Sequence, residues 1–509
     1  MGSKLIHNSV IVTVLIILGK ISSFLRDVFI SKVYGASDST DAFFVANNIP
    51  GILYAGFILS ILMFFIPLYT EKREKFGKDQ ADLFVSNLWA LLLICATFLS
   101  LTGFFISPFI TKIAAPGFSG EKLALTIKFS RIMVLSFPFT ATILLFSSLQ
   151  NANGKFAIAQ TPTLFSSLII LLGIFLFSQS YGVVALVWSS IIATIFNAAL
   201  QYISSIGIYR HIWEFKLITP ELKKMFFLAF PVFIGLTADE INIFVNGVIC
   251  SSLPDGSVSY LNYSQRLLQT INGTFVTGTL VVLYPFFSVL AARANYCEVN
   301  RIMCKSIRVV TIILLPVVII FFFYSYEVVR LVFFRGNFSL VALSETSAVL
   351  QFYSLSILFL AYRELFNRIF YTFQDAKTPA YVGVCSVILN IILSLILVKL
   401  YGVCGLAMSA AIASLFTTLL LYQQLKKKLS SCEVYILFDN RFLLGTFLAS
   451  LSMVLCVIFL EKFIPSFNKF SFLFEILFSM LIYSLILVSF RLQEVTFFVD
   501  MIKTRLSRK

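Results

Sequence analysis

Apolar runs of about 20 residues, separated by short polar breaks, recur along the whole of this chain. Hydrophobic residues make up 59% of the 509 residues, charged residues make up 12%, and the mean hydropathy is +0.95. A run of this length crosses the hydrocarbon core of a bilayer as a helix, because the helix satisfies every backbone polar group within the segment. The pattern therefore predicts an all-α polytopic membrane protein with about 14 transmembrane helices.

Basic residues are concentrated in alternate polar breaks, and the formal net charge is +15. The clusters lie at residues 72–78, 210–224, 293–305, 426–428 and 503–509. Because Lys and Arg mark the cytoplasmic loops of membrane proteins, we expect a multi-pass protein with both termini in the cytoplasm. Topology and contact with anionic membrane lipids account for this charge, so we expect no nucleic-acid partner.

Cysteine and histidine usage argues against a metal centre. The eight cysteines are scattered singly, and the two histidines lie near predicted helix ends. We expect neither a disulfide framework nor a metal site, and no resident cofactor. An enzyme acting on a membrane lipid would need paired carboxylates or a histidine near a leaflet surface. The sequence offers no such arrangement, and we expect a protein that is not an enzyme.

An internal repeat indicates the architecture. The segment Thr161–Tyr202 recurs as Thr378–Tyr422, with Thr-Pro and then Tyr-Gly-Val at matching places, at an offset of roughly 220 residues. Because the offset spans an even number of helices, the two copies have the same orientation, as in transporters built from parallel repeats. The prediction is an N-terminal six-helix lobe at residues 1–215, a C-terminal six-helix lobe at residues 216–430, and two additional helices with a basic tail at residues 431–509.

Charged residues inside predicted helices are the candidate site. Lys20, Arg26 and Asp41 lie in the first predicted hairpin, and Arg266 lies in the eighth span. Charges at membrane depth normally face a bundle interior or a watery cavity, and an ammonium and a guanidinium suit phosphate oxygens. The alternative is that such residues only pair with one another to fix helices, and for Asp27 beside Arg26 we favour that interpretation.

A second candidate site would bind a cation. Asp239 and Asn242 share a face of the seventh span, and Asn390 lies in the eleventh. Carboxylate and amide oxygens suit an ion such as Na⁺, and the alternative is that the asparagines only hydrogen-bond to a neighbouring helix.

Several stretches together resemble the MurJ (MviN) lipid II flippases of the multidrug/oligosaccharidyl-lipid/polysaccharide exporter superfamily, whose fold is MATE-like. They are RDVFISKVYGASDSTDAFFVANNIP at Arg26–Pro50, YLNYSQRLLQ at Tyr260–Gln269 and RIFYTFQDAKTP at Arg368–Pro379. The resemblance implies two lobes around a cationic cavity and a groove for a polyprenyl tail on the last two helices. It also implies alternating-access transport of lipid II from the cytoplasmic to the outer leaflet of a bacterial cytoplasmic membrane, for peptidoglycan synthesis, cell-wall biogenesis and cell shape.

Carried over by motif, the resemblance implies that Lys20, Arg26, Asp41 and Arg266 bind the substrate. Lys20 stands where the family has an arginine, and a further family arginine is absent from the stretch 50–55. Asp239 and Asn390 fit the pattern of sodium-coupled members, whereas Ser394 replaces an acid, so coupling to Na⁺ or to the membrane potential is left open.

Alternatives to a lipid II flippase also follow from these departures. They are a flippase for another polyprenyl-diphosphate-linked glycan, a drug or cation exporter of the same superfamily, and a transport-silent scaffold of envelope synthesis. The expected partners are a polyprenyl-diphosphate lipid and membrane lipids, with cell-wall synthesis proteins as candidates.

Overall fold

A computed structural model describes residues 2–51, 56–214, 219–273, 296–373, 375–429, 438–463 and 469–490, together with Phe287, Leu492 and Glu494. The side chains of residues 2–10, 461–463 and 469–471, and most of those in 220–239, lie outside this description. The described chain is helical and contains no strand. Eight described helices are long and apolar enough to cross a membrane, and two bent helix pairs bring the number to ten. The all-α polytopic fold is therefore confirmed, and about 14 spans for the whole chain is roughly consistent with this number.

The chain divides into two compact units, which are described separately below. The first comprises Met1–Tyr263 and Phe333–Ala342, and the second comprises Ser264–Val332 and Leu343–Lys509. The predicted lobe boundaries at residues 1–215, 216–430 and 431–509 stay a prediction.

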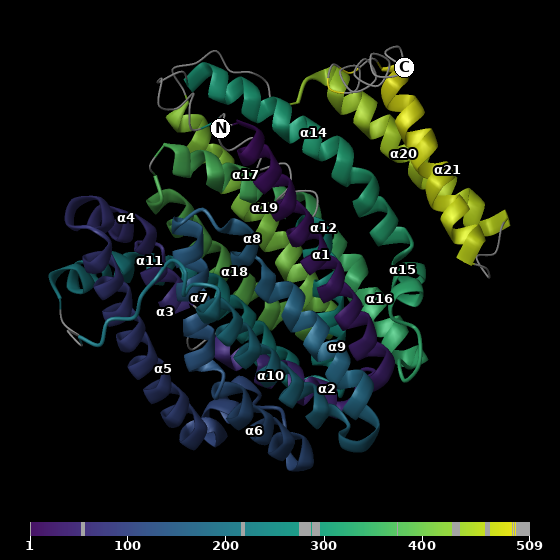
Figure 1. Cartoon of the computed structure of the whole chain (residues 1–509). Coiled ribbons are helices and arrows are strands. Elements are labelled where there is room, and N and C mark those ends of the chain that lie inside the picture. The colour runs from purple at the N-terminus through teal and green to yellow at the C-terminus, as the bar shows by residue number, and fades with distance from the viewer. Residues whose placement is uncertain are drawn as a thin grey trace. The chain divides into compact units, whose positions relative to one another are not determined.

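Helices of the first unit run from the N-terminus to the start of α12 (Figure 1). They are α1 (Gly2–Tyr34), α2 (Asp38–Pro50), α3 (Gly56–Leu62), α4 (Phe65–Phe76), α5 (Lys78–Ala114), α6 (Gly120–Val134), α7 (Phe137–Ala152), α8 (Phe156–Ala159), α9 (Thr161–Tyr181), α10 (Val183–Ile203), α11 (Pro220–Ser251) and the beginning of α12 (Ser257–Ile271). Within this unit α1 packs on α9, α2 on α6, and α5 on α6 and α7.

The second unit contains the rest of α12 and the later helices. They are α14 (Tyr296–Phe323), α15 (Ser325–Val332), α16 (Leu340–Ser354, whose first turn belongs to the first unit), α17 (Ser356–Thr372), α18 (Lys377–Tyr401), α19 (Val403–Lys428), α20 (Asn440–Phe463) and α21 (Lys469–Ser489). The last two helices lie side by side, in yellow-green and yellow in Figure 1. Arg308 of α14 holds them, because its guanidinium lies 3.4 Å from carboxylates of both Asp439 and Glu494.

The internal repeat reappears in the backbone. Gly182 joins α9 to α10 with φ 54° and ψ −140°, and Gly402 joins α18 to α19 with φ 55° and ψ −136°. A positive φ is readily adopted by glycine, so the shared Tyr-Gly-Val sequence makes the same tight helical hairpin in each copy.

A break between α6 and α7 has a local cause. The two helices are bent by 42° at residues 135–136. Pro138 lies in the first turn of α7, where its ring would clash with the carbonyl of Val134 in a continuous helix. The span therefore bends here, and α6 can tilt independently of α7.

Cysteines depart from expectation at one position. Cys95, Cys250, Cys304, Cys385, Cys404 and Cys456 are free, whereas Cys297 is disulfide-bonded. The scattered spacing did not predict this bond.

Candidate functional site

A buried carboxylate organises the polar cluster at the start of α2. Asp41 is 1% exposed, and both of its oxygens are fully used. Oδ1 accepts hydrogen bonds from the backbone N–H and the hydroxyl of Ser259, at 2.8 and 2.6 Å. Oδ2 accepts from the N–H of Gly256 at 2.8 Å and from the ammonium of Lys122 at 2.9 Å. Because these N–H groups stand at the unpaired N-terminus of α12, Asp41 caps that helix from another part of the chain.

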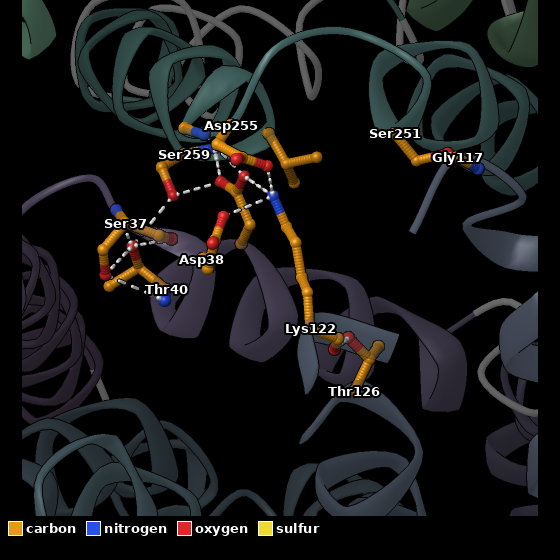
Figure 2. Close-up of polar contacts among 12 residues, drawn as sticks. Ser37, Asp38, Thr40, Gly117, Lys122, Thr126, Ser251, Asp255 and Ser259 are labelled. Carbon is orange, nitrogen blue, oxygen red and sulfur yellow. Dashed lines mark hydrogen bonds and ion pairs between the residues drawn. The ribbon is translucent and has the colours of Figure 1, made fainter. Parts of the chain in front are cut away.

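Lys122 joins three carboxylates, as Figure 2 shows. Its Nζ lies 2.9 Å from Asp38, 2.9 Å from Asp41 and 2.8 Å from Asp255, and 4.4 Å from the centre of the Phe118 ring. An ammonium has three N–H donors, so these carboxylates satisfy it completely. Within the described chain, no group of acidic, histidine and cysteine side chains forms a metal site, and the lysine fills this cluster instead.

The local sequence explains how α2 presents its two acids. Ser37 is the N-cap residue of α2, with φ −137° and ψ 171°. The Ser37 and Thr40 side chains each bond the other's backbone N–H, which forms a capping box. Asp38 and Asp41 therefore stand in the first turn, where a negative charge is favoured by the helix dipole.

Asp255 lies in the exposed turn between α11 and α12, outside any membrane-spanning helix. The hydrogen bond from Lys122, supported by one from Asp38, holds the pKa of the Asp255 carboxyl below its usual range. This turn is therefore tied to α2 and α6 by a carboxylate that stays charged.

Contacts in the same unit join residues of the two predicted lobes at further turns. The hydroxyl of Tyr263 donates to the carbonyl of Gly35 at 2.8 Å. Asn337 donates from its backbone to Lys32 at 2.9 Å and from its side chain to Val33 at 2.6 Å. We call these contacts, together with those of Asp41 and Lys122, the seal; it joins the turns at residues 35–41, 115–122, 251–259 and 335–338.

Three glycines allow the backbones in the seal to approach closely. A Cβ on Gly117 would collide with the backbone of Ser251, and the Gly117 N–H lies 3.3 Å from the Ser251 hydroxyl. A Cβ on Gly35 would collide with the Asn337 carbonyl, and a Cβ on Gly336 with the Lys32 carbonyl. These positions need glycine because backbone touches backbone.

The predicted substrate residues of α1 have different surroundings. Lys20 is half-buried. Arg26 donates to Asp27 Oδ1 from Nε at 3.1 Å and from Nη2 at 2.9 Å, and both side chains are mostly buried. The prediction that Arg26 pairs with Asp27 is therefore confirmed, and the guanidinium keeps further N–H groups for a ligand.

Arg266 belongs to the second unit, where its Nη1 lies 3.4 Å from the side-chain oxygen of Gln269. Lys20, Arg26 and Asp41 belong to the first unit. A common substrate site formed by these four residues stays a prediction.

The candidate cation residues are likewise distributed over the two units. Asn242 is half-buried on α11, and the Asp239 side chain lies outside the described residues. Asn390 on α18 is 1% exposed and accepts a hydrogen bond from Ser394, which also bonds Ser409 on α19 at 2.7 Å. Asn390 thus takes part in helix-to-helix bonding, and cation binding stays a prediction.

Sequence reasoning missed Lys122 and Asp255. A signal was present, because a lysine in a predicted external loop departs from the positive-inside pattern and stands among predicted external turns that carry Asp38, Asp41 and Asp255. Charges of opposite sign on the same side of a membrane indicate a contact, but the sequence does not say which turns meet.

Comparison with known proteins places this geometry in a family. The family model described as "Lipid II flippase MurJ" matches residues 30–487. A probable lipid II flippase MurJ of Buchnera aphidicola is 28% identical over 468 residues, which cover 90% of each chain. The lipid II flippase MurJ of Burkholderia cenocepacia is 24% identical over 429 residues, covering 81% of this chain and 82% of that protein.

Solved structures show the same fold. A lipid II flippase MurJ in an inward closed conformation superposes with a TM-score of 0.82 at 24% identity, over 97% of this chain and 100% of the other. An inward-facing multidrug resistance MATE family transporter of the MOP superfamily gives 0.70 at 12% identity, over 83% and 98%. With a family match that covers most of its length, the chain belongs to the MurJ family of lipid II flippases.

Proposed function

We propose that this protein is a lipid II flippase that moves the lipid-linked peptidoglycan precursor across a bacterial cytoplasmic membrane. The observation that carries the proposal is the family match over residues 30–487. Relatives named as lipid II flippases, similar over most of their length, support it. The protein is a transporter of a polyprenyl-diphosphate lipid and performs no covalent chemistry on it.

The seal supplies one half of an alternating-access cycle. It joins turns of the two predicted lobes at one end of the helices through buried, fully bonded groups. Opening of this end requires these contacts to break, while the opposite end stays free to admit substrate. Basic clusters in alternate loops support an orientation with both termini in the cytoplasm, so the seal closes the external side.

Cationic side chains in the predicted cavity hold the diphosphate. Lys20, Arg26 and Arg266 neutralise its charge, which lowers the cost of taking the head group through the hydrocarbon layer. The substrate must bind the inward-facing and outward-facing states with different affinity, since a ligand of equal affinity shifts no population. Coupling to Na⁺ through Asp239, Asn242 and Asn390, or to the membrane potential, would supply the direction of transport.

Complementation tests the function. The gene is expressed in a bacterium whose own lipid II flippase can be switched off, and external lipid II is scored with a cleaving toxin that acts only from outside. Restored growth together with restored cleavage is the expected result. A well-expressed protein that restores neither would contradict the proposal and favour another lipid-linked glycan or a scaffold.

A further inference from the structure

One exposed helix face of the first unit carries two basic residues. Lys128 and Arg131 are one turn apart on α6, and both are exposed. The opposite face of α6, which includes Phe129, Ser130 and Met133, is buried. Because α6 packs on α2 and α5 through its buried side, the two cations point away from the protein.

The surroundings of Arg131 are a lipid-facing surface. Its guanidinium lies 5.6 Å from the centre of the Phe104 ring, which packs edge-on against Phe105 at 5.7 Å. Phe105 is 75% exposed, and Phe109, one turn further along α5, is 67% exposed. Large exposed phenylalanines on a membrane-spanning helix contact lipid, so the cation pair also faces lipid.

The depth of the pair follows from its contact with α5. Arg131 Nε donates to the hydroxyl of Ser107 at 3.2 Å. At 1.5 Å per residue, Ser107 lies about 10 Å along the helix from Ala114, the last residue of α5. In the proposed orientation this end is external, so the side chains reach the boundary between the hydrocarbon core and the head groups of the outer leaflet.

Within the described part of the chain, neither Lys128 nor Arg131 contacts a carboxylate, and the hydrogen bond of Arg131 to Ser107 uses one of five N–H donors. Unpaired cations at this depth are costly, and an anion that reaches them from the bilayer removes that cost. Phosphate oxygens at the head-group boundary have the matching charge and geometry.

We propose that Lys128 and Arg131 form a binding site for the phosphate of a lipid head group in the outer leaflet. The phosphate belongs to a phospholipid or to a polyprenyl diphosphate, and the second source would make the site a station for the transported lipid after release. The choice of leaflet rests on the proposed function, whereas phosphate binding itself does not.

Lipid retention tests this site. The full-length protein is reconstituted in vesicles of equal parts phosphatidylglycerol and phosphatidylcholine and extracted in mild detergent, and the retained lipids are quantified by mass spectrometry. Substitution of both residues, Lys128→Gln with Arg131→Gln, should lower the retained ratio of phosphatidylglycerol to phosphatidylcholine by about fivefold per cation. The charge-keeping pair Lys128→Arg with Arg131→Lys should retain the parent ratio, and it separates loss of charge from misfolding.

Lys399→Gln is the matched control, because Lys399 is an exposed cation in the last turn of α18 with no basic residue one turn away. An equal ratio in the parent, the double Gln variant and this control would overturn the proposal. A short-chain polyprenyl diphosphate is then added as competitor: displacement of phosphatidylglycerol assigns both lipids to the site, and no displacement assigns the phospholipid alone. Retention is scored without transport, so a chain that fails to expose lipid II can still pass or fail this test.

Discussion

Lys122 and Asp41 lie 2.9 Å apart on α6 and α2, and both belong to the predicted N-terminal lobe. The other partners of Asp41, Gly256 and Ser259, belong to the predicted C-terminal lobe. If the lobes part here, the ion pair stays together, and only bonds from neutral groups are lost to water. Parting a buried ion pair would instead leave an uncompensated charge, which is strongly unfavourable. The seal can therefore open and close without orphaning a charge.

Removal of the ammonium should open the seal. In Lys122→Met the closed state holds Asp41 as a buried charge without a cation, at a cost of about 3 kcal/mol, or about a hundredfold in the ratio of closed to open. Ser257→Cys is the reporter, because Ser257 is 2% exposed and lies beside Gly256. Labelling by a membrane-impermeant maleimide from outside should rise in Lys122→Met and stay low in Lys122→Arg.

The control for this variant is Lys75→Met. Lys75 pairs with Glu71 at 2.6 Å on the exposed surface of α4, where such a pair contributes about 0.3–0.5 kcal/mol. Labelling of the reporter should not change. Equal labelling in Lys122→Met and Lys75→Met would show that Lys122 does not hold the seal.

Acid should weaken the tie made by Asp255. Its pKa is lowered in the folded protein by the hydrogen bond from Lys122, so its contribution is present above the ordinary value of about 3.9 and is lost as the pH falls through the folded value. The parent should melt slightly above Asp255→Asn between about pH 5 and 7, and the two melting temperatures should converge below about pH 4.

Glu121→Gln is the control for the pH series, because Glu121 neighbours Lys122 in the first turn of α6 but does not bond it. Its melting curve should follow the parent at every pH. A gap between the parent and Asp255→Asn that stays constant down to pH 3 would contradict the role given to Asp255.

Sequence reasoning reached the fold and part of the site for physical reasons. Apolar run length, a repeated Tyr-Gly-Val turn and the adjacency of Arg26 and Asp27 are local or periodic signals, and the structure contains all three. The seal depends on which turns meet, and neither the length nor the charge of a turn encodes its partner. Lys122 therefore went unnoticed, and Asp41 was predicted from charge alone without its partners Gly256 and Ser259.

Glycine at position 336 should be required for closure. Gly336 has φ 61°, and a Cβ there would collide with the Lys32 carbonyl. Gly154 has φ 74° and no atom within 4 Å of such a Cβ, so Gly154→Ala carries the backbone strain of about 1 kcal/mol without the collision. Labelling of the Ser257→Cys reporter should rise several-fold in Gly336→Ala and remain unchanged in Gly154→Ala. The same labelling in both would assign the effect to backbone strain.

Arg266 and Lys20 should be needed for transport and not for folding. A hydrogen bond to a charged group contributes about 1.5–3 kcal/mol, so each change to alanine should weaken diphosphate binding by roughly tenfold to a hundredfold. Toxin-accessible lipid II should then fall to background in the double variant, with membrane levels and melting temperature close to those of the parent. Gln269→Ala is the control, since Gln269 bonds Arg266 at 3.4 Å without carrying charge, and it should keep most of the transport. Full transport by the Lys20→Ala, Arg266→Ala double variant would remove these residues from the mechanism, because no cation on either predicted lobe would then be holding the head group at these positions.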